Sequence, residues 1–179
     1  MTAVHTKAIG ERNVADRPTR RAVETKRRTQ KILAAVDGSE RTGRVLEYLI
    51  GLTESGIPIE VVVLNVQPEP EDWRLRGYIS FKQDEIHDRL VNDLGKPIIT
   101  SVGRTLDQGG IAHKDRIELG EPAQTIVRCA NEERCDLIVV SEPRPGAIRR
   151  WLTRTTGLSF GSVASNVVQL TEMPVIVVK

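Results

Sequence analysis

The stretch SEPRPGAIRRWLTRTTGLSFGSVASN (141–166) follows a short apolar run, DLIVV (136–140), and leads into a helical pattern. The apolar run predicts a buried strand. Loops between a parallel strand and a helix N-terminus are places where α/β proteins hold phosphate groups. This loop therefore raises the question of a nucleotide site. It carries three glycines and four arginines, Arg144, Arg149, Arg150 and Arg154.

Outward from this loop, the chain alternates strand-like and helix-like segments. Further strands are expected at 31–36, 59–66, 112–119 and 175–178. Helices are expected at 40–55, at about 81–108, from Pro122 onward and at about 161–172, with Pro97 kinking or dividing the second of them. The run 59–66, IEVVVLNV, is typical of a strand buried on both faces. The run 112–119 is more polar and is expected at a sheet edge.

Five strands separated by helix-length segments predict an α/β fold, a single open parallel sheet with helices on both faces, Rossmann-like. Ligands on such sheets bind outside the carboxyl ends of the strands, where the strand order reverses. If the strands at 31–36 and 136–140 are neighbours at that point, the turn DGSE (37–40) and the loop from residue 141 face one crevice.

The composition is that of an ordinary soluble domain. The chain has 179 residues, of which 39% are hydrophobic and 28% charged. No apolar run approaches the roughly 18 residues of a membrane helix, and the first residues lack the apolar core of a secretory signal. We therefore expect a cytoplasmic protein without a membrane role. Cys129 and Cys135 match no metal or redox spacing and are expected to be buried thiols.

The charge is unevenly distributed. Residues 1–30 hold eight Lys/Arg and three acidic residues, a net +5, which leaves −3 for residues 31–179 out of the overall +2. The sequence thus divides into a basic N-terminal arm (1–30) and one domain (31–179). Such an arm can bind nucleic acid or an acidic partner, or it can be a solvated leader without a specific partner. The second interpretation is favoured, because the arm has no aromatic residue to stack on bases.

Four stretches resemble the universal stress protein family: KILAAVDGSE, VVVLNVQP, GEPAQTIVRCANEERCDLIVVS and GSVASNVVQLTEMPVIVVK. The resemblance covers about 31–179, nearly everything except the arm. It implies an adenine-nucleotide-hydrolase-like fold with strand order 3-2-1-4-5 and a homodimer, commonly paired through the last strand. The apolar strand VIVV (175–178) agrees with this, because an uncovered apolar edge strand is a liability.

Many members of this family bind ATP through a glycine pattern after the fourth strand, G-x2-G-x9-G-[S/T]. At the first two glycine positions this chain has Ser141 and Arg144. The closing pair is present as Gly161-Ser162, about seven residues later than the pattern requires, and Gly146 or Gly157 are alternative displaced equivalents. Half of the phosphate-binding pattern is therefore retained, and the arginines offer forked donors that suit phosphate.

The resemblance assigns further residues to an adenine nucleotide. Asp37 would contact the adenosine moiety, Ala35 and Val66 would form apolar walls, and Val140 would lie beneath. Gly161, Ser162 and Val163 would present the start of the last helix to the phosphates. Local roles are equally open: Asp-Gly-Ser is good turn chemistry, and Ser162 can cap a helix.

Several chemistries are absent from the sequence. There is no P-loop, no dinucleotide fingerprint, no nucleophile elbow and no metal-ligand spacing, so we expect no dedicated enzyme activity. Three hypotheses remain. The first is an ATP-binding dimeric stress protein. The second, favoured by Ser141, Arg144 and the lengthened loop, is a dimeric adaptor that binds no nucleotide. The third is a nucleic-acid factor acting through the arm. Neither the stress nor the protein partner follows from the sequence.

Overall fold

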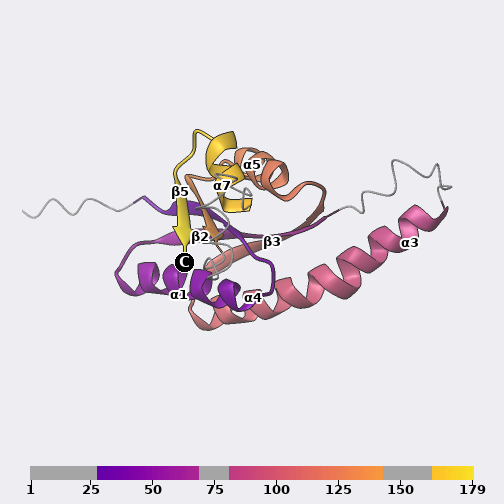
Figure 1. The fold of residues 1–179 in the computed structure, drawn as a ribbon. Helices are drawn as coiled ribbons and strands as arrows, with labels where there is room; N and C mark the ends of the chain where they lie inside the picture. The colour runs from indigo at the N-terminus through magenta and orange to yellow at the C-terminus, as the bar shows by residue number, and fades with distance from the viewer. Residues whose placement is uncertain (1–27, 69–80, 143–162) are drawn as a thin grey trace, which may run out of the picture.

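The computed structural model describes residues 28–68, 81–142 and 163–179. Their core is a five-stranded, all-parallel sheet in the order β3-β2-β1-β4-β5 (Figure 1). The strands are β1 (Gln30–Ala35), β2 (Ile59–Gln67), β3 (Ala112–Leu119), β4 (Leu137–Ser141) and β5 (Val175–Val178). The predicted fold class is confirmed, and so is the edge position of the polar third strand.

Helices pack on both faces of the sheet (Figure 1). One face is covered by α1 (Glu40–Glu54) and α4 (Lys96–Gln108), the other by α5 (Pro122–Glu132) and α7 (Val163–Leu170). The first face buries Ile32, Val61, Val45, Leu49 and Leu106, among others. The second buries Leu33, Leu64, Ile126, Ile138 and Val167. Successive side chains of β1 and β2 point alternately into these two hydrophobic cores. Continuous apolar runs predict this arrangement, because both faces of the strand are buried.

The long helix expected at 81–108 is not uniform. It consists of α3 (Phe81–Arg89), a π-helical segment η1 (Leu90–Gly95) and α4. Pro97 lies in the first turn of α4, where a missing N–H is tolerated, so the irregularity precedes the proline. Gly95 permits close packing, because a Cβ there would lie 2.7 Å from Ile117 Cγ2. α3, which precedes η1 in the chain, extends away from the sheet (Figure 1).

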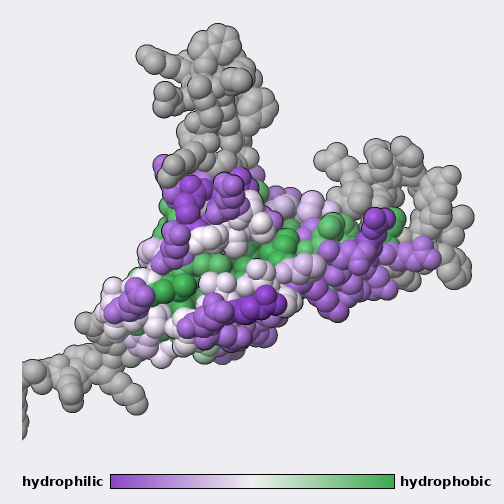
Figure 2. All heavy atoms as spheres, turned by 90° about the horizontal axis from the view of Figure 1, so that it is seen from below, coloured by the Kyte–Doolittle hydropathy of each residue, from purple (hydrophilic) through white to green (hydrophobic). Residues whose placement is uncertain are grey.

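The molecule seen from below shows a band of apolar side chains between polar ones (Figure 2). Leu94 in η1 is one of the large apolar side chains left half exposed.

On the opposite face of the sheet, Cys129 and Cys135 are free and buried, as expected. Burial raises the pKa of Cys135 to about 11, so this thiol is inert at neutral pH.

Candidate functional site

The carboxyl ends of β1 and β4 lie side by side. Ala34 is paired with Val139 in the parallel register, so Ala35, the last residue of β1, lies level with Val140, the penultimate residue of β4. Ala35, Val66 and Val140 all belong to the core on the α5 and α7 face, Val140 buried and the other two partly exposed. The structure therefore places on one face of the sheet the three apolar residues that the family resemblance assigned to an adenine slot.

Asp37 follows β1 and is held by a dense set of local hydrogen bonds. Its Oδ1 accepts from the Ser39 backbone N–H at 3.0 Å, the Ser39 Oγ at 2.6 Å and the Thr42 Oγ1 at 3.2 Å. Its Oδ2 accepts from Arg41 Nη2 at 2.5 Å, and the two residues form an i,i+4 ion pair. The turn chemistry predicted for Asp37 is thus present, and its side chain remains 47% exposed.

The electrostatics of this turn keep Asp37 ionised. Partial burial alone would raise its pKa, but the hydrogen bonds from Ser39 and Arg41 outweigh burial and hold the pKa below its usual value. Asp37 is therefore a charged acceptor at neutral pH, two residues beyond the carboxyl end of β1. A carboxylate in such a place can accept hydroxyl or amino hydrogens from a ligand.

Two further residues hold the turn, and neither was singled out from the sequence. Thr42 Oγ1 accepts from the backbone N–H groups of Asp37 and Gly38, at 3.3 and 3.1 Å. Asn65 is buried at the end of β2 and donates from Nδ2 to the Val36 carbonyl at 2.8 Å. The signal for Asn65 was available, because it is a polar residue within an otherwise apolar strand.

The phosphate side of the predicted site is only partly described. Ser141 ends β4 in register with Val178 of β5. Val163 begins the described part of the last helix and is 42% exposed. Arg144, Gly161 and Ser162 lie outside the described residues. The role of these three residues in phosphate binding stays a prediction.

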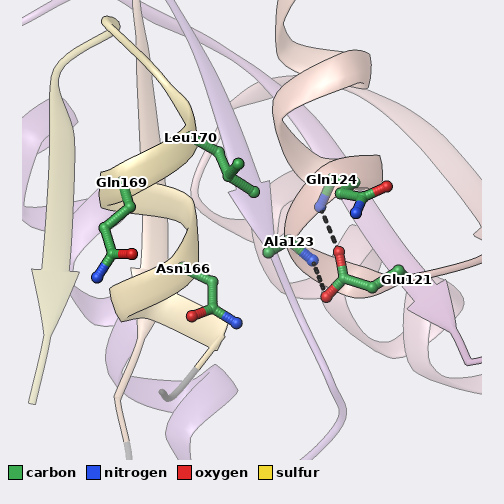
Figure 3. A pocket seen from close by; sticks show the side chains of 6 residues that line it. All are labelled: Glu121, Ala123, Gln124, Asn166, Gln169 and Leu170. Atoms are coloured by element: carbon green, nitrogen blue, oxygen red, sulfur yellow. Dashed lines mark hydrogen bonds between the residues drawn. The ribbon is translucent and has the colours of Figure 1, made fainter. Parts of the chain in front are cut away.

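A separate hollow of about 260 Å³ lies between α5 and α7 (Figure 3). It is lined by Glu121, Ala123, Gln124, Asn166, Gln169 and Leu170. The Glu121 carboxylate is engaged, because it accepts from the backbone N–H groups of Ala123 and Gln124 and so caps α5. The lining offers side-chain amides and no cation. Because phosphate binding favours positive charge, this hollow is a poor phosphate site, and none of the residues assigned above lines it.

Among residues 28–68, 81–142 and 163–179, no group of three or more His, Cys, Asp and Glu side chains is arranged to hold a metal ion. No helix within the same residues is both long and apolar enough to cross a membrane.

A model described as the universal stress protein family matches residues 28–179 of this chain. Universal stress protein MJ0577 of Methanocaldococcus jannaschii is 28% identical over 161 residues, which cover 84% of this chain and 94% of that protein. A solved structure of MJ0577 has a TM-score of 0.65 at 26% identity, over 84% of this chain and 95% of that one.

Two more distant solved structures share the fold. A universal stress protein from Archaeoglobus fulgidus, in complex with dAMP, is 22% identical with a TM-score of 0.54, over 85% of this chain and 98% of its own. A universal stress protein family member from Arabidopsis thaliana, with AMP bound, is 18% identical with a TM-score of 0.58, over 84% and 91% of the two chains.

Proposed function

The chain belongs to the universal stress protein family, and from this premise we propose that it binds an adenine nucleotide at the carboxyl ends of β1 and β4. One observation carries the proposal. Asp37 is a charged, partly exposed acceptor two residues past Ala35, and Ala35 shares one core with Val66 and Val140. Apolar walls suit the faces of a purine base, and a carboxylate suits the hydroxyls of a ribose.

Family relatives support the choice of ligand. Members of the same fold were solved with AMP and with dAMP bound. ATP is the nucleotide that the glycine pattern implies, and Ser141 is a departure from that pattern. Ser141 lies in register with Val178 within the β4–β5 ladder, so its backbone is extended and needs no glycine conformation. The serine therefore imposes no backbone strain on the proposed site.

Ser141 also keeps the second candidate open, a dimeric adaptor that binds no nucleotide. Strand β4 continues through Ser141, the position of the first glycine in the family pattern, and the Glu142 N–H donates to the Val178 carbonyl at 2.9 Å. Because this N–H is already bonded, fewer backbone donors remain there for a phosphate. In this candidate the family fold serves protein contacts alone. A measurement of nucleotide binding distinguishes the two candidates, because only the first binds a nucleotide.

A homodimer through β5 is part of the proposal, because the two sheet edges differ. Charged residues Lys114, Asp115 and Arg116 occupy the edge strand β3, and inward or edge charges discourage strand pairing. The opposite edge, β5, consists of four valine or isoleucine residues, all partly exposed. An apolar edge of this kind is stabilised when a second copy covers it.

The proposed activity is binding, with nucleotide state altering the dimer or its partners, and not turnover. The sequence places no pair of carboxylates in the predicted crevice for acid–base chemistry. The cytoplasmic location, the basic arm at 1–30 as a separate unit and the nucleic-acid hypothesis remain predictions.

The test is to identify any ligand that copurifies, by mass spectrometry, and to titrate the protein with ATP, ADP and AMP while following Tm. A bound nucleotide at one hundred times its Kd stabilises the fold by about 2.7 kcal/mol, which gives a clear rise in Tm. Ala35→Leu fills the slot without altering Asp37 and should abolish the rise. The exposed Asp88→Asn change on α3 is the control. Protein that ignores all three nucleotides would favour the adaptor.

A further inference from the structure

The hydrogen bonds of Asp37 leave one direction open to a ligand. Oδ1 already accepts three donors, from Ser39 and Thr42, which saturates an oxygen with two lone pairs. Oδ2 accepts one donor among the described residues, Arg41 Nη2 at 2.5 Å. A ligand hydroxyl that bonds Asp37 without dismantling the turn therefore approaches Oδ2, directly beside the Arg41 guanidinium.

Arg41 has donors to spare. A guanidinium has five N–H donors, and within the described structure its Nε is buried without a hydrogen-bond partner. The Nε of Arg44 is in the same condition. Residues three apart lie on one face of a helix, so both arginines project from the same side of the first turns of α1. Buried donors without acceptors are rare in native proteins and commonly mark an unmet ligand or water.

We propose that Arg41 pairs with a phosphate group of the ligand whose hydroxyl Asp37 holds, and so makes the site select nucleotides over the nucleoside. The inference rests on the proposed function, since it concerns the same site. Arg44, one turn further along α1, supports it with a second positive charge on the same face.

The charges explain why Arg41 is needed there. Asp37 is ionised, and an unpaired carboxylate would repel a phosphate attached to the same ribose. The ion pair with Arg41 offsets that repulsion, and the planar guanidinium can bond phosphate oxygens in pairs while it remains next to the carboxylate. The Arg41 side chain is one-third exposed, so donors of its guanidinium other than the buried Nε can reach a ligand from solvent.

The test compares adenosine with AMP and ATP by isothermal titration calorimetry, on the full chain and on Arg41→Gln. We expect Arg41→Gln to weaken AMP and ATP binding about tenfold or more, the scale of one charged hydrogen-bonding contact, and to change adenosine binding by less than about twofold. Arg104→Gln makes the same charge change at an exposed position in the second half of α4, which runs toward the other end of the sheet, and should leave all affinities unchanged.

The outcomes separate the two proposals. If the unaltered protein binds AMP and Arg41→Gln changes adenosine and AMP equally, or changes neither, Arg41 is not a selectivity residue while the nucleotide site stands. Tighter AMP binding by Arg41→Gln would show that Arg41 competes for Asp37, which also overturns the inference. Absence of binding by the unaltered protein overturns the nucleotide site itself. Arg41→Lys keeps the charge without the fork and serves if Arg41→Gln does not fold; it should lower the preference for AMP over adenosine by less than tenfold, and an unchanged preference would overturn the inference.

Discussion

The side-chain amide of Asn65, buried at the carboxyl end of β2, donates a hydrogen bond of 2.8 Å to the carbonyl oxygen of Val36. Gln67 Nε2 in turn donates to Asn65 Oδ1 at 2.7 Å. Val36 immediately precedes Asp37, and its own N–H donates to the Leu64 carbonyl. Asn65 thus extends the β1–β2 ladder by side chain and fixes where the turn that carries Asp37 leaves the sheet.

Asn65→Ala should destabilise the protein by about 1–3 kcal/mol, because the Val36 carbonyl loses a buried hydrogen-bond partner and the Gln67 amide loses a partly buried one. Urea unfolding followed by circular dichroism measures the change. Asn92→Ala, at an exposed position in η1, is the matched control and should change stability by no more than about 0.5 kcal/mol. Equal effects of the two substitutions would contradict a role for Asn65 in holding the turn.

Gly38→Ala should destabilise the turn after β1 for two reasons. Gly38 has φ +74°, which L-residues rarely adopt, and a Cβ there would lie 2.7 Å from Ile98 Cγ1. We expect a loss of about 1–3 kcal/mol in the free energy of unfolding. Gly43→Ala, inside α1 with open space around the new Cβ, should instead stabilise by up to about 1 kcal/mol. Thermal unfolding should therefore show a lower Tm for Gly38→Ala and a higher Tm for Gly43→Ala. Changes of the same sign would contradict the prediction.

Acid should weaken the fold through an ion-pair cluster between β3 and α5, formed by Arg116, Arg128, Glu118, Glu132 and Glu133. Burial alone would raise the pKa of Glu118, but hydrogen bonds from Arg116 and Arg128 hold it below its ordinary value of 4.5. Glu118 therefore binds a proton more readily in the unfolded chain than in the folded one. Its contribution to the free energy of unfolding is complete above about pH 5–6 and is lost as the pH falls through the pKa of the folded state.

Arg116→Gln tests that cluster. The free energy of unfolding should fall at pH 7, and it should fall less steeply between pH 6 and pH 3 than in the unaltered protein, so that the two curves converge in acid. The control is Arg89→Gln, which removes an exposed ion pair with Asp93 and should leave the curve within about 0.5 kcal/mol of the original. Parallel curves for Arg116→Gln would show that its carboxylate partners do not titrate with folding.

Val177→Pro should convert the proposed dimer into a monomer. The Ile138 and Glu142 N–H groups donate to the carbonyls of Pro174 and Val178, so these alternate β5 residues face β4, and Val177 directs its own N–H to the free edge. Proline there removes an outward donor without breaking the ladder to β4. Analytical ultracentrifugation measures the mass, and Val177→Thr, which keeps the N–H, is the control. A monomer before substitution would refute pairing through β5.

Much of the fold could be predicted because the signals are local. The apolar, β-branched run of β2 and the polar run of β3 indicated a central strand and an edge strand, and the strand order followed from the family resemblance. The π-helical turn before Pro97 could not be located, because it depends on how Gly95 packs against Ile117 in another element. A proline indicates that a helix is disturbed and leaves the position of the disturbance to tertiary packing.

The sequence by itself determined the strands and the helices from residue 40 and from Pro122, and its resemblance to the family pointed to Asp37 as the acceptor of interest. The strands and the helix starts depend on neighbours within a few residues, through periodicity and capping. Tertiary structure alone decided that Asn65 supports the turn from 29 positions away, that Ile98 closes over Gly38, and that Ala35, Val66 and Val140 share one core. Contacts of this kind depend on strand register and helix packing, which bring together residues that no local pattern relates.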